Sequence, residues 1–264
     1  MTDSIAAAHT EPKLNFGRVI QGTFGVIKRN IANFLILILL LMGLPGVLMV
    51  VGGVQLSQGA MASGGSVIGL GYLILLVTSN ILQGALIHAT VADLNGRRAT
   101  LAECLRTGMR FFLPLTAILI LYGLGVFFAF FLLIVPAIMI GLAWAVAIPS
   151  EVVERTGVFG AFTRSGQLTK NNRWRIFGLL LLWTIVYTTV QSTLTQLAGL
   201  GAAPMAAAAS ASPLAALGPA YWIVLAISTF ANALVGGPGM AVIYYELRRA
   251  KEGVGPEALA SVFD

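Results

Sequence analysis

Residues 113–150 read "LPLTAILILYGLGVFFAFFLLIVPAIMIGLAWAVAIPS", and none of these positions carries a charged side chain. An α-helix rises about 1.5 Å per residue, so about 20 residues cross a bilayer core of about 30 Å. The stretch is too long for one such helix and long enough for two. It therefore predicts a transmembrane hairpin that turns within "FFAFFLLIVP", residues 127–136.

The distribution of charge extends this pattern to the whole chain. The 16 Lys and Arg and the 10 Asp and Glu residues fall in four segments: 1–30, 93–110, 151–175 and 246–264. Each uncharged block between them is long enough for two membrane crossings, so all four segments are expected on one side. Lys and Arg mark the cytoplasmic side of a membrane. The sequence thus predicts an all-α, polytopic protein of a bacterial inner membrane with both termini in the cytoplasm.

The composition agrees with a membrane protein. Of 264 residues, 58% are hydrophobic and only 10% are charged, whereas soluble domains contain roughly 25% charged residues. The net charge of +6 follows the membrane boundaries, so we expect anionic lipid rather than nucleic acid as a partner. A single cysteine, Cys104, excludes an internal disulfide.

Six spans fit the apolar blocks, and each pair of spans follows an amphipathic segment. The spans are expected at about 31–53, 67–92, two within 113–150, 176–198 and 219–245. The apolar stripes of the preceding segments are Phe16, Ile20, Phe24, Ile27 and Ile31, then Leu101, Cys104, Leu105, Met109 and Phe112, then Val158, Phe162, Ser165 and Leu168. Such segments suit helices in the headgroup plane. We predict one membrane domain, 14–264, with three repeats of an interfacial helix and a hairpin, at about 14–93, 98–151 and 157–246. A flexible tail, 1–13, precedes it, and a cytoplasmic tail, 247–264, ends it.

The segment "AFTRSGQLTKNNRWRIFGLL", residues 161–180, combines four basic side chains with Ser, Thr and Asn residues. It is expected to contain the third interfacial helix, a turn, and the entry into the fifth span. Its candidate ligands for lipid headgroups are Arg164, Ser165, Lys170, Arg173 and Arg175. Trp174 suits the headgroup level, where amphipathic rings are favoured.

Polar side chains within the spans are the second group of candidates, because such residues are costly in a bilayer. They are Asn80, Gln83, His88, Gln191, Gln196 and Asn232. They could line a polar route around a sixth helix broken at Pro238, or they could form hydrogen bonds between helices. No nucleophile or metal motif is recognisable, so no catalytic residue, metal or cofactor is expected.

The stretch "PSEVVERTGVFGAFTRSGQLTKNNRWRIFGLLLL", from Pro149, resembles the glycerophosphoryl diester phosphodiesterase membrane-domain family, as does the closing "YYELRRAKEGVGPEALASVFD". The resemblance covers roughly 145–180 and 244–264. It implies a stand-alone bacterial membrane protein, because the His and Glu motifs of the catalytic phosphodiesterase barrel are missing. It implies no assigned biochemical role.

Three functions remain open from the sequence. The first is a non-enzymatic membrane protein that organises lipids or partner proteins, or its own copies, through its basic interfacial helices. The second is a small transporter or channel with a polar route around the sixth helix. The third, chemistry on lipid headgroups, would need His88, Glu151 and Glu246 at one depth.

Overall fold

The computed structural model is all-α and describes residues 14–210 and 216–253. The predicted tail 1–13 and residues 254–264 of the predicted C-terminal tail lie outside this range. The described helices are α1 (Phe16–Ser57), α2 (Met61–Leu94), α3 (Leu101–Leu132), α4 (Ile134–Ala143), α5 (Ala147–Glu154), α6 (Val158–Thr169), α7 (Arg173–Leu197), α8 (Ala203–Ala208) and α9 (Pro219–Glu252).

Six stretches of helix are long and apolar enough to cross a membrane. They are Phe16–Ser57, Met61–Leu94, Leu101–Phe131, Ile134–Glu154, Arg173–Leu197 and Pro219–Glu252. Their outward faces expose large apolar side chains, such as Leu113 and Phe131, which are more than 70% exposed. Soluble monomers rarely expose extended apolar surfaces of this kind. The chain is therefore a multi-pass membrane protein, as predicted.

The hairpin predicted in residues 113–150 is confirmed. α3 ends at Leu132, Leu133 is extended with φ −179° and ψ 155°, and α4 begins at Ile134. This turn lies within residues 127–136. The returning span differs from the expected single helix, because it consists of α4 and α5 with a break at Trp144–Val146.

The three amphipathic segments take three different forms. The first is the beginning of α1, which bends at Asn30, where φ is −117° and ψ is 15°. The second is the start of α3 and continues into the span without interruption. The third is α6, a separate helix. The bend at Asn30 is held from outside the helix, because its amide donates to Asp93 Oδ1 at 2.8 Å. The threefold repeat remains a prediction.

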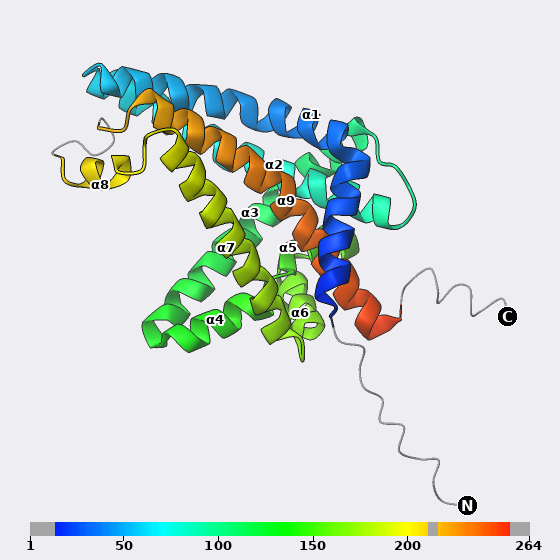
Figure 1. The fold of residues 1–264 in the computed structure, drawn as a ribbon. Coiled ribbons are helices and arrows are strands. Elements are labelled where there is room, and N and C mark those ends of the chain that lie inside the picture. Colours follow the sequence, from blue (N-terminus) through cyan, green and yellow to red (C-terminus); the bar gives the residue numbers. More distant parts are fainter. Residues whose placement is uncertain (1–13, 211–215, 254–264) are drawn as a thin grey trace, which may run out of the picture.

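α1, α2 and α9 lie side by side, α3 crosses α2 and leads to α4, and α7 packs on α9 and α4 (Figure 1). Small residues allow close approach where helices cross. A Cβ on Gly108 of α3 would lie only 2.3 Å from the carbonyl oxygen of Ile81 on α2. A Cβ on Gly53 of α1 would lie 2.2 Å from the indole of Trp222 on α9.

The predicted break in the sixth helix is wrong. α9 is continuous from Pro219 to Glu252, with Pro238 buried inside it. Proline removes one backbone donor, but its fixed φ is compatible with a helix, and transmembrane helices tolerate the missing bond. α9 continues into the predicted C-terminal tail 247–264 as far as Glu252 and is followed by Gly253 with φ 65°. The boundary of this tail remains a prediction.

Ion pairs join the described parts of all four charged segments. Arg29 of the first segment pairs with Asp93 of the second at 2.5 Å. Arg18 of the first pairs with Glu246 of the fourth at 3.1 Å. Arg164 of the third pairs with Glu252 of the fourth. These contacts agree with the prediction of a common side. Its assignment to the cytoplasm remains a prediction.

Candidate functional site

The first predicted candidate for headgroup binding, Arg164, belongs to an internal ion-pair network. Its Nε donates to both carboxylate oxygens of Glu154, at 3.0 and 2.7 Å, and its Nη2 donates to Glu252 Oε1. Tyr244 of α9 donates to Glu154 Oε1 at 2.6 Å. Burial by itself would lower the pKa of the Arg164 guanidinium, but the hydrogen bonds to both glutamates outweigh it and raise that pKa. The network joins α5, α6 and α9.

Ser165 is fully buried and forms hydrogen bonds to backbone groups at the break in the fourth span. Its hydroxyl donates to the carbonyl oxygen of Ala143 at 2.8 Å and accepts from the backbone N–H of Val146 at 3.2 Å. Both groups border the break between α4 and α5, where backbone donors and acceptors lose their helical partners. Thr169 adds a donor to the same carbonyl oxygen at 3.2 Å. Ser165 is therefore inaccessible to a headgroup, and the sequence prediction for this residue is corrected.

The remaining three basic candidates differ in their surroundings. Arg175 donates to the carbonyl oxygen of Leu14 at 2.6 Å and so fixes the chain entering α1. Lys170 is exposed. Arg173 is partly exposed, and its Nε atom is buried without a hydrogen-bond partner. Of the five predicted residues, Lys170 and Arg173 are the two without a hydrogen bond or ion pair to another described residue.

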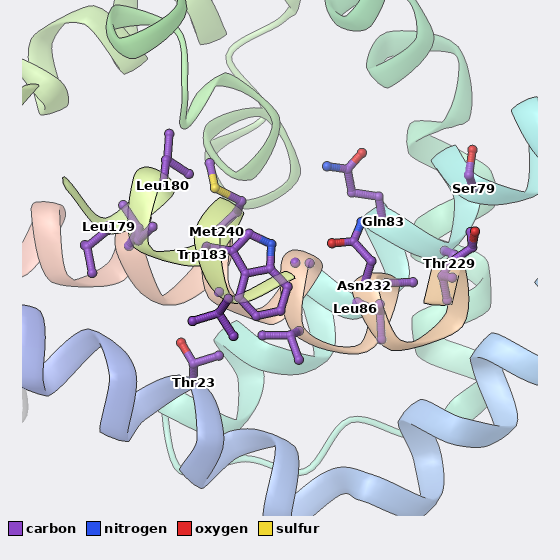
Figure 2. Close-up of a pocket in the computed structure, with 18 of the residues that line it drawn as sticks. Thr23, Ser79, Gln83, Leu86, Leu179, Leu180, Trp183, Thr229, Asn232 and Met240 are labelled. Carbon is purple, nitrogen blue, oxygen red and sulfur yellow. The ribbon is translucent and has the colours of Figure 1, made fainter. Parts of the chain in front are cut away.

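A cavity of about 840 Å³ lies between α1, α2, α7 and α9. Its size is within the range of ligand-binding pockets, roughly 300–1,000 Å³. Most of its walls are aliphatic or aromatic, with Leu179, Leu180 and Trp183 of α7 facing Leu86 of α2 and Met240 of α9 (Figure 2). Among the described residues, α7 packs on α9 and α4 but not along α2, which leaves room for the cavity.

The cavity brings together two of the six predicted intramembrane polar residues. Gln83 of α2 and Asn232 of α9 both line it, and their amide groups project into it (Figure 2). Asn80 instead donates to the carbonyl oxygen of Leu76 within its own helix at 2.8 Å. His88, Gln191 and Gln196 are not among the residues that line it. The six residues therefore do not line a single route in the described structure.

Several cavity residues were not predicted from the sequence. Thr23 in the amphipathic part of α1, Trp183 in α7, and Ser79 and Thr229 also line it. Apolar residues surround most of each span, so periodicity gives no signal for which face meets a cavity. A glycine in a span is only a weak indication that its helix face borders a cavity. Gly236 is such a case, because it lines the cavity and a Cβ there would meet no atom within 4 Å.

Two further observations bear on metal binding and headgroup chemistry in the described part of the chain. In the described part of the chain, no group of three or more His, Cys, Asp and Glu side chains could hold a metal ion. Glu246, one of the residues considered for headgroup chemistry, pairs with Arg18 and Arg249.

Comparison with family models, curated proteins and solved structures finds no match for the chain. The resemblance to the glycerophosphoryl diester phosphodiesterase membrane-domain family remains a prediction.

Proposed function

We propose that this protein is a non-enzymatic membrane protein that binds a membrane lipid in the cavity between α1, α2, α7 and α9. The observation that carries the proposal is the cavity itself, which has about 840 Å³ of space and largely apolar walls. An apolar cavity of this kind is a site for hydrocarbon rather than for water.

The position of the cavity supports lipid as the occupant. Phe24 of α1 and Tyr72 and Leu76 of α2 line it, and each is about half exposed. These residues belong to candidate spans, so the opening of the cavity faces the region that a bilayer would occupy. A lipid could therefore enter from the side without crossing water.

The basic residues at the start of α7 have a secondary role in this proposal. Lys170 and Arg173 flank the start of α7, and Trp174 beside them is 75% exposed. Cationic and indole side chains are favoured next to lipid headgroups. In this account they anchor α7 at the membrane surface, with anionic lipids as neighbours, and the cavity holds the bound lipid.

Photolabelling tests the proposal. Nanodiscs of phosphatidylethanolamine and phosphatidylglycerol would carry the protein together with a lipid that bears a diazirine on its acyl chain. A diacylglycerol probe and a phosphatidylglycerol probe are used separately. We expect at least one of them to label residues 179–186 or 229–240, as mapped by peptide mass spectrometry.

The matched variants are Gly236→Phe and Gly69→Phe. Gly236 lines the cavity, whereas Gly69 on α2 is exposed and lies outside it, and a Cβ at either position meets no atom within 4 Å. Filling the cavity with G236F should abolish the labelling, and G69F should leave it unchanged. If neither probe labels these residues, or if G236F labels as strongly as G69F, the proposal is wrong.

A further inference from the structure

The amide groups of Gln83 and Asn232 are the unusual feature of the cavity. The three serine and threonine hydroxyl groups that line it each donate to their own helix: Thr23 to Val19, Ser79 to Leu76 and Thr229 to Leu225. Tyr72 adds a phenol hydroxyl. The two amides differ, because neither has a hydrogen-bond partner among the described residues. An amide that faces apolar surroundings without a partner costs free energy.

The two amides come from different helices and meet in one cavity. Gln83 lies on α2, Asn232 lies on α9, and both side chains point into the same space (Figure 2). Each amide offers two N–H donors and one carbonyl acceptor. Together they present both kinds of hydrogen-bonding group to a bound molecule. Trp183 of α7 lies on the same cavity.

Charge excludes one class of bound group from this position. None of the residues that line the cavity is an Asp, Glu, Lys, Arg or His. A phosphate or carboxylate placed beside the amides would be desolvated without a counter-charge, which is strongly unfavourable. The matching ligand group is polar and uncharged.

From these observations we infer that the cavity selects an amphiphile whose polar part is uncharged, such as a hydroxyl, ester or amide, and holds that part between Gln83 and Asn232. Its hydrocarbon lies against the apolar residues of α7 and α9. This inference rests on the proposed function and specifies its ligand class. A neutral glycerolipid and a long-chain alcohol share the required chemistry.

The experiment compares head groups on equal acyl chains. Diazirine-bearing diacylglycerol, 1-alkanol and phosphatidylglycerol would compete with unlabelled lipid in the same nanodiscs. We expect diacylglycerol and the alkanol to label the cavity in preference to phosphatidylglycerol. Diacylglycerol without the alkanol would identify the glycerol ester as the recognised group, and the alkanol without diacylglycerol would identify the hydroxyl.

The variants Gln83→Met and Asn232→Leu keep the approximate volume and remove the amides. Losing these hydrogen bonds should weaken labelling by the uncharged probes about tenfold in the double variant. Gln196→Met is the control, since Gln196 is exposed on α7 and outside the cavity. A fluorescence size-exclusion profile confirms that each variant is folded.

The outcomes separate this inference from the proposal beneath it. If phosphatidylglycerol labels the cavity as strongly as diacylglycerol, or if the double variant labels like wild type, the inference is wrong while lipid binding stands. If no probe labels the cavity, or if G236F has no effect, the proposed function itself fails.

Discussion

The close crossing of α2 and α3 leads to a quantitative prediction for Gly108→Ala. A methyl group there would lie 2.3 Å from the carbonyl oxygen of Ile81, and that separation must grow to at least 3.0 Å. The atom it meets belongs to the backbone, so rotation of a side chain cannot relieve the clash and the two helices must move apart. Overpacking of this kind typically costs about 1–3 kcal/mol.

Gly123→Ala is the matched control, because Gly123 lies on the same helix and a Cβ there meets nothing within 4 Å. Both variants gain about 1 kcal/mol of helix propensity, so their difference isolates the steric cost. We expect G108A to be less stable than G123A by about 1–3 kcal/mol. The assay is unfolding by sodium dodecyl sulfate in mixed micelles, followed by circular dichroism. Equal stability within about 0.5 kcal/mol would refute the close approach of α2 and α3.

Three further predictions concern the polar contacts, with stability measured in the same way. Ser165→Ala should lower the free energy of unfolding by about 1–3 kcal/mol, because it leaves the N–H of Val146 without a partner; a neutral result would reopen a headgroup role for Ser165. Arg164→Met should cost about 1.5–3 kcal/mol, because Glu154 loses its guanidinium partner and Glu252 keeps only that of Arg248, whereas the exposed Arg106→Met should stay within about 0.5 kcal/mol. Asp93→Asn should cost about 1.5–3 kcal/mol, because Asp93 accepts from Arg29 and from Asn30 at the bend of α1; an unchanged midpoint would show that the bend does not depend on this carboxylate.

The charge pattern was sufficient to predict the spans and the meeting of the charged segments. Charges avoid a bilayer at every position, so an uncharged block reports a crossing regardless of how the helices pack. The turn between α3 and α4 was predicted within residues 127–136 because the uncharged block 113–150 is too long for a single span. Gly96 and Gly253 have positive φ after the ends of α2 and α9, whereas Arg155 takes the left-handed conformation at the end of α5 and Gly157 is the N-cap of α6.

Features that depend on helix rotation and lateral packing were not predictable from the sequence. Ser165 has the spacing of a lipid-facing stripe, yet α6 turns it toward the break between α4 and α5. Gln83 and Asn232 were recognised as polar intramembrane residues, but hydropathy does not show that they share a cavity while Asn80 bonds within its own helix. Pro238 illustrates a second limit, because a local rule for helix breaking does not include the packing that surrounds the residue.

Native mass spectrometry of the protein extracted in a mild detergent tests the central claim most directly. The account predicts that wild-type protein and G69F retain a bound lipid with an uncharged polar group, and that G236F, which fills the cavity, loses it. Wild-type protein without bound lipid, or a lipid retained equally by G236F, would contradict lipid binding in this cavity.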